Sequence, residues 1–185
     1  MFAGHIATGL AIRARVPKAP ALAIFVGVVL LDLIFSILVW AGIERVTPTP
    51  GLAPGARNDF IDWSHSLGMA LFWSVLFAVP FAKRGRAVAW AAAGSVFSHF
   101  VLDLAMHPHD LALYPYATTH LGFGLWQSLP VGWWLVEGAL VVGACAYYWL
   151  RARDLQTFGG RATWATLVVL ALHVSNSPWL LGRGF

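Results

Sequence analysis

The chain has 185 residues, of which 59% are hydrophobic and only 11% are charged, and its mean hydropathy is +0.71. Soluble domains carry about 25% charged residues, so this composition excludes a water-soluble domain and predicts a single integral membrane domain over residues 1–185. The net charge of +4 does not indicate a nucleic-acid partner, because the basic residues gather in short connections between apolar segments.

The predicted elements begin with a short helix at residues 2–16, which is too short to cross a bilayer and is expected to insert into a helix bundle. Crossing about 30 Å of hydrocarbon takes about 20 apolar residues, and five later segments meet that length. They lie at about residues 20–43, 62–82, 87–106, 130–150 and 163–181. The predicted fold is therefore all-α, a polytopic membrane helix bundle of five transmembrane helices and one short N-terminal helix.

Basic residues indicate the orientation of this bundle. They gather in three alternate connections: Arg13, Arg15 and Lys18; Lys83, Arg84 and Arg86; Arg151, Arg153 and Arg161. Connections rich in lysine and arginine normally stay in the cytoplasm. We therefore expect the loops 44–61 and 107–129 and the C-terminus to face outward.

Four ionisable residues interrupt the apolar segments: Asp32, His65, His99 and Asp103. Burying such a group in hydrocarbon costs roughly 2.5–3.5 kcal/mol on insertion scales, so these groups are normally paired, hydrated or bound to a ligand. With a rise of about 1.5 Å per residue, the four lie about 20–26 Å from the cytoplasmic side. Their depths coincide in the outer half of the bilayer, which His5 on the short helix can also approach.

The types and spacing of these residues point to a metal. His99 and Asp103 are four residues apart, so both side chains leave the same face of one helix. With Asp32 and His65 they form a set of four nitrogen and oxygen ligands, which suits zinc or another divalent transition metal. Asp–His pairs also form buried ion pairs without a metal, and this alternative stays open. Two neighbouring carboxylates nevertheless call for a compensating cation.

Further polar residues carry weaker expectations. Glu137 and His173 lie within later spans, where we expect them to contact polar groups of neighbouring helices. The outward loop 107–129 has no lysine or arginine and contains three additional candidates for metal ligation or substrate contact: His107, His109 and His120. Whether this loop caps the site, binds a ligand or is simply solvated stays open.

Short motifs recur in a known order along residues 4–116. They read HIATG from His5, LD at residues 31–32, SHSL at 64–67 and HFVLD at 99–103. In this order they resemble the membrane-bound metal-dependent hydrolases, the YdjM-like proteins of the bacterial inner membrane. The ligand order is also similar to that of the zinc-dependent phospholipase C and P1 nuclease group.

The resemblance implies a set of metal ligands. The residues implied for one metal, with zinc as the expected ion, are Asp32, His65, His99 and Asp103. His5 and a bridging Asp103 would hold a second metal. The chain departs from the family at Ile34, where a second acid is common, and at residues 60–63, where the family often has His-Arg. We therefore expect one divalent metal, and a second depends on His5.

The activity that the resemblance implies is hydrolysis of a phosphoester in a lipid or lipid-linked substrate. A divalent metal lowers the pKa of bound water toward 7, and Asp62, Asp110 or a loop histidine could serve as the base. A non-catalytic accessory subunit of a larger membrane complex is the alternative, in which the cluster is structural. A haem or chlorophyll protein would use an intramembrane histidine as axial ligand, but this leaves Asp32 and Asp103 unexplained.

Overall fold

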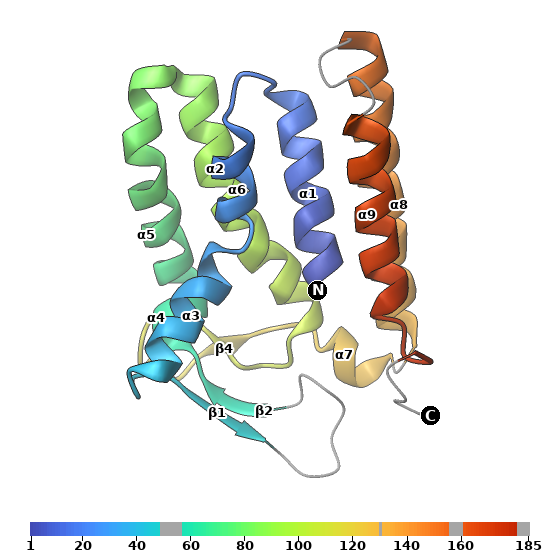
Figure 1. Cartoon of the computed structure of the whole chain (residues 1–185). Helices are drawn as coiled ribbons and strands as arrows, with labels where there is room; N and C mark the ends of the chain where they lie inside the picture. The colour runs from blue at the N-terminus through green and yellow to red at the C-terminus, as the bar shows by residue number, and fades with distance from the viewer. Residues whose placement is uncertain (49–56, 130, 156–160, 181–185) are drawn as a thin grey trace.

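The computed structural model of the chain describes residues 1–48, 57–129, 131–155 and 161–180, and these are mostly helical (Figure 1). The helices are α1 Phe2–Arg15, α2 Ala21–Gly27, α3 Leu30–Trp40, α4 Asp62–His65, α5 Leu67–Ala78, the 3₁₀ helix η1 Val79–Arg84, α6 Arg86–Met106, α7 Leu125–Ser128, α8 Gly132–Leu155 and α9 Arg161–Ser175. The predictions for the C-terminus and for the middle of loop 44–61 lie outside the described residues.

Three helical segments are long and apolar enough to cross a membrane: Leu67–Arg84, Arg86–Met106 and Gly132–Ala152. The pair of α2 and α3 adds a fourth if it is counted as one bent span. The 15-residue α9 is apolar but shorter than these. The described part of the chain therefore has three or four candidate spans where the sequence predicts five. Their length and composition indicate association with a membrane.

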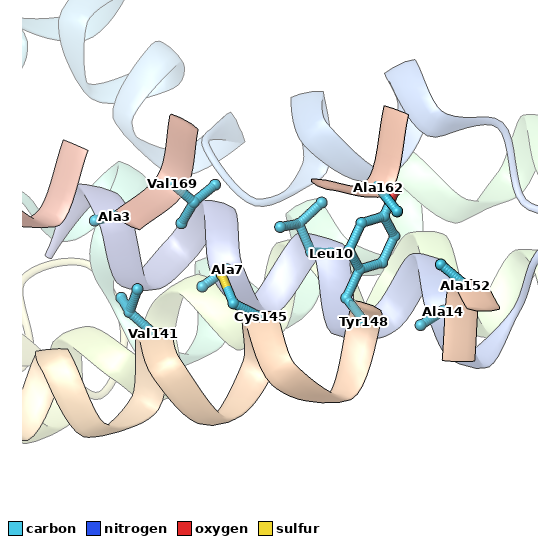
Figure 2. Packing of buried hydrophobic residues seen from close by; sticks show 10 residues of the cluster. All are labelled: Ala3, Ala7, Leu10, Ala14, Val141, Cys145, Tyr148, Ala152, Ala162 and Val169. Carbon is cyan, nitrogen blue, oxygen red and sulfur yellow. The ribbon is translucent and has the colours of Figure 1, made fainter. Parts of the chain in front are cut away.

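The short helix α1 lies among the longer ones and contacts α2, α6, α8 and α9 (Figure 1). Figure 2 shows the buried residues that line its contact with α8 and α9. They are Ala3, Ala7, Leu10 and Ala14 of α1, Val141, Cys145, Tyr148 and Ala152 of α8, and Ala162 and Val169 of α9. Because three of the four residues on α1 are alanines at helical spacing, the helices can approach closely. This packing fixes the helix that carries His5.

The predicted span at residues 20–43 is divided in the structure. Its two halves, α2 and α3, meet at an angle of 53°. At the break, a β-carbon on Gly27 would lie 1.9 Å from Ser95 Oγ, so glycine allows α2 to pack directly against α6. The carbonyl of Val28 accepts a hydrogen bond from His99 Nδ1 over 2.8 Å. A carbonyl at the helix break is therefore satisfied by a side chain of α6.

The predicted span at residues 62–82 also begins later than expected. Ser66 has an extended backbone (φ −72°, ψ 154°), and its side chain accepts a hydrogen bond from the Met69 N–H over 3.4 Å. Serine in this position caps the start of α5. His65 therefore lies on the four-residue α4 that precedes the span, and the prediction that it lies within the span is wrong.

Two small antiparallel sheets complete the described structure and were not predicted. β1 (Arg45–Pro48) pairs with β2 (Arg57–Phe60), and β3 (Leu111–Ala112) pairs with β4 (His120–Leu121). They lie at one end of the bundle, opposite the α1–α2 and η1–α6 connections (Figure 1). Pairing satisfies backbone groups of these strands, which lie at the end of the bundle that carries α4 (Figure 1).

Candidate metal centre

Five side chains from four helices converge at one point: His5 of α1, Asp32 of α3, His65 of α4, and His99 and Asp103 of α6. The Nε2 atom of His99 lies 3.0 Å from Asp103 Oδ2, 3.5 Å from Asp32 Oδ1 and 3.4 Å from His65 Nε2. His65 Nε2 lies 3.7 Å from each of these carboxylate oxygens. His5 Nε2 lies 3.3 Å from Asp103 Oδ1. The structure thus brings together all five predicted ligands.

Burial differs sharply within this cluster. His5, His65, His99 and Asp103 are buried. The side chain of Asp32, in contrast, is 49% exposed. Among the five residues, Asp32 is therefore the one that faces the surroundings, and the cluster is accessible from its side.

The orientation of His99 leaves one ring nitrogen for a ligand. Its Nδ1 contacts the Val28 carbonyl, which can only accept a hydrogen bond, so Nδ1 carries the hydrogen. In the neutral ring, Nε2 then has a free lone pair. That lone pair belongs to the atom that faces Asp32, His65 and Asp103. A carbonyl behind a ligating histidine is a common arrangement at metal sites.

His65 is oriented by a longer chain of hydrogen bonds that begins at Glu44. The Ser64 hydroxyl donates to Glu44 Oε2 over 2.7 Å, and the Ser64 N–H donates to Glu44 Oε1 over 2.8 Å. Because the hydroxyl has one hydrogen, Ser64 Oγ accepts the Nδ1–H of His65 over 2.7 Å. Nε2 of the neutral His65 ring is again unprotonated.

Glu44 was not predicted to belong to the site. It is only 1% exposed, and burial raises the pKa of its carboxyl above the ordinary value, although the hydrogen bonds from Ser64 oppose this. In the sequence it follows an apolar segment and looks like an ordinary loop charge. Its role depends on a contact with a residue 20 positions away, which no local pattern signals.

Five distances within the cluster are close to those between the ligands of a tetrahedral metal. Four ligands at about 2.0–2.1 Å from a zinc ion lie about 3.3–3.4 Å from one another. Between Asp32 Oδ1, His65 Nε2, His99 Nε2 and Asp103 Oδ2, five of the six separations lie between 3.0 and 3.7 Å. At these distances the two carboxylates call for a compensating positive charge, which a divalent cation or a protonated imidazole supplies. The residues therefore fit a divalent metal.

His5 offers ligand atoms on the other side of Asp103. Its ring stacks on that of His99 with centroids 3.8 Å apart and planes 6° from parallel. Ligand atoms of His5, His99 and Asp103 lie within 4.8 Å of one another, as do those of Asp32, His65 and His99. The two groups of three share His99. Among the described contacts, Nδ1 of His5 is buried without a hydrogen-bond partner.

The other predicted site residues divide into two groups. Nδ1 of His107 lies 3.1 Å from Asp110 Oδ1, and its ring centroid lies 6.4 Å from that of His65. Burial disfavours the charged form of His107, but the hydrogen bond with Asp110 and the negative charges of Asp103 and Asp110 together outweigh it and raise the pKa of His107 above its ordinary value. Asp62 is also buried, and its Oδ2 accepts the Tyr116 N–H over 2.8 Å.

His109 and His120 are different, because both are exposed. The structure describes no contact that joins either of them to the cluster. His120 instead lies on β4, where its Nδ1 is 3.3 Å from the Thr118 carbonyl.

Glu137 and His173 make the contacts between helices that the sequence predicts. Glu137 Oε1 accepts the Gly4 N–H over 2.9 Å, which joins α8 to α1. His173 Nδ1 of α9 lies 3.7 Å from the other carboxylate oxygen. Neither residue belongs to the groups of described residues that could hold a metal.

Comparison of the chain with protein-family models, with curated proteins and with solved structures found no match. The likeness to the membrane-bound hydrolases therefore rests on the motifs quoted above.

Proposed function

We propose that this protein is a membrane-embedded, metal-dependent hydrolase that cleaves a phosphoester in a lipid or lipid-linked substrate. The observation that carries this proposal is the set of four ligand atoms from Asp32, His65, His99 and Asp103, with five separations of 3.0–3.7 Å. A mixed nitrogen and oxygen set of this size favours a zinc-type ion. The order of the ligands along the chain supports the resemblance to the membrane-bound metal-dependent hydrolases.

The proposed bundle has five spans: the bent pair α2–α3, α5 with η1, α6, α8 and α9. The α1–α2 and η1–α6 connections and the start of α9 lie at one end of the bundle (Figure 1). Basic residues gather in or next to all three, so this end is the cytoplasmic one. The opposite end, with the strands, would face outward from a bacterial inner membrane. The metal cluster then lies nearer the outer leaflet, where a lipid head group is within reach.

Asp32, His65, His99 and Asp103 would hold a zinc-type ion, which would lower the pKa of bound water toward 7 and polarise a phosphoryl oxygen. His65 and His99 would bind the metal through Nε2, since Nδ1 of each ring is held by a hydrogen bond, and the two carboxylates would offset its positive charge. The half-exposed Asp32 leaves one side of the cluster open, and the phosphoester enters on that side.

We assign the acid–base role to His107, with Asp110 as its positioning residue. The Asp110 carboxylate accepts the Nδ1–H of His107 and leaves Nε2 for proton transfer. Asp62 was another candidate base in the sequence, but its Oδ2 accepts the Tyr116 N–H. Asp62 is therefore better suited to hold the loop 107–129 in place.

The activity is tested with bis(p-nitrophenyl) phosphate in detergent micelles and with phospholipid vesicles. Purified zinc-loaded protein is expected to hydrolyse one of these substrates, to lose activity to a chelator and to regain it with zinc. His99→Ala removes a central ligand and should abolish hydrolysis. His109→Ala changes an exposed histidine and should not. Hydrolysis that persists in His99→Ala would overturn the proposed site. A zinc-loaded protein that hydrolyses neither substrate would favour the accessory subunit.

A further inference from the structure

The helix that carries His5 obtains its N-terminal hydrogen bond from another part of the chain. α1 begins at Phe2, and Met1 provides no side-chain cap. The first N–H groups of a helix have no partner within the helix. For Gly4, the partner is Glu137 Oε1 of α8, 2.9 Å away in a buried contact between residues 133 positions apart. A carboxylate is well suited here, because the start of a helix carries partial positive charge.

Glu137 is in turn accompanied by His173 of α9. Both side chains are buried, and His173 Nδ1 lies 3.7 Å from Glu137 Oε2. A β-carbon on Gly138 would lie 2.7 Å from His173 Nε2, so glycine gives the ring its space. The ring stacks on Trp134 at 4.5 Å, and Trp134 Nε1 donates to the His173 carbonyl over 3.1 Å.

The hydrogen bond between Gly4 and Glu137 bears on the metal cluster because His5 directly follows Gly4. His5 lies in the first turn of α1, stacks on His99 and has its Nε2 3.3 Å from Asp103 Oδ1. Without an acceptor for the Gly4 N–H, this first turn loses the bond that ties it to α8. Its position relative to α6 then depends on side-chain packing alone.

We propose that Glu137, accompanied by His173, is a positioning residue that holds His5 in the metal cluster. This inference rests on the proposed metal site, and it adds α8 and α9 to the elements on which that site depends. Outer residues that orient ligands typically contribute 10- to 100-fold to metal affinity. Glu137 therefore acts on the metal through Gly4 and His5, with no contact of its own.

The test is the zinc affinity of detergent-purified protein, measured by competition with a chromogenic chelator. Glu137→Ala is expected to weaken zinc binding about 10- to 100-fold. In the double variant with His5→Ala it should weaken binding no further, because His5 is already lost. In the double variant with His65→Ala, whose hydrogen bonds lead to Glu44 instead, the two effects should multiply. Glu137→Gln keeps an oxygen that can accept from Gly4 and should retain most of the affinity.

Three results would overturn this inference while leaving the metal site intact. The first is wild-type affinity in Glu137→Ala, and the second is a loss that multiplies with that of His5→Ala. The third is loss of zinc in His99→Ala but not in His5→Ala. If the wild type binds no zinc, the proposed function itself fails. If Glu137→Ala does not fold, Glu137→Asp takes its place under the same criteria, because its shorter side chain withdraws the carboxylate from Gly4.

Discussion

The orientation of each histidine in the cluster depends on the atom behind its second ring nitrogen. Val28 supplies a carbonyl for His99, and Ser64 supplies a hydroxyl for His65. Each of these contacts places the hydrogen on Nδ1 and leaves Nε2 for a metal. Removal of a group behind the ring should therefore weaken metal binding without removing a ligand.

Glu44 gives a direct test of this dependence. In Glu44→Ala the Ser64 hydroxyl loses its shorter hydrogen bond and keeps only the Ile61 carbonyl at 3.2 Å as acceptor. It can then also donate to His65 Nδ1, which favours the wrong tautomer. We expect zinc affinity to fall about 10- to 100-fold, as measured by chelator competition. Glu44→Gln keeps an amide oxygen that can accept one of the two bonds from Ser64. Its zinc affinity should therefore lie between those of the wild type and Glu44→Ala. Affinity equal to wild type in Glu44→Ala would show that this chain of bonds does not orient His65.

Variants of His107 test catalysis independently of metal binding. His107→Gln is expected to keep the metal content of the wild type, because His107 is outside the proposed ligand set, and to lower kcat about 10²- to 10⁴-fold through loss of the proton-transferring group. Asp110→Asn should give a smaller loss in the same direction. Metal analysis and hydrolysis of the same samples check both. A variant His107→Gln that loses its metal would make His107 a ligand.

At the residue scale, the sequence predicts ligands better than it predicts what supports them. His99 and Asp103 could be paired because helix geometry places residues four apart on one face. Asp32 and His65 could be recognised as candidate ligands because ionisable residues are rare in apolar segments. Glu44 carried neither signal, since its burial results from a contact that forms only in the folded chain.

At the scale of elements, the break between α2 and α3 connects packing to the site. Gly27 allows α2 to approach Ser95 of α6, and the next residue, Val28, binds His99. The apolar run through residues 20–43 gives no sign of this break, because the break depends on two side chains of a helix about 70 positions later. The end of α6 at Met106 could be predicted closely, because it follows from the apolar segment itself.

Gly27→Ala should therefore affect both stability and the metal. Its β-carbon would lie 1.9 Å from Ser95 Oγ, and overpacking of this kind typically costs about 1–3 kcal/mol. We expect a lower thermal midpoint in detergent and weaker zinc binding, with partial recovery in Gly27→Ala/Ser95→Ala. Gly94→Ala is the matched control, because nothing lies within 4 Å of its added carbon. Equal effects of Gly27→Ala and Gly94→Ala would contradict the proposed coupling.

At the scale of the whole molecule, the proposed orientation rests on basic residues at one end of the bundle. Cys145 is the single cysteine, so a Cys145→Ser background allows one new cysteine at a time. His120→Cys should react with a membrane-impermeant maleimide in intact cells. Lys83→Cys, in the basic connection, should react only after the membrane is opened. The reverse pattern would invert the proposed orientation.

The mostly helical fold could be predicted from composition, because long apolar runs in a membrane must form helices or closed barrels. The paired strands were missed, since sheets of two to four residues leave little pattern in a loop. The convergence of the ligands was expected from their depths, and the structure brings all five together.

The central claim is that these residues bind a divalent metal, and metal content tests it most directly. Detergent-purified protein should contain about one zinc-type ion per chain, as expected for a single shared set of ligands, when measured by inductively coupled plasma mass spectrometry. His99→Ala and Asp103→Ala should lose this metal, and the exposed-site control His109→Ala should keep it. Stoichiometric metal that survives both substitutions, or a wild type that binds none, would contradict the account.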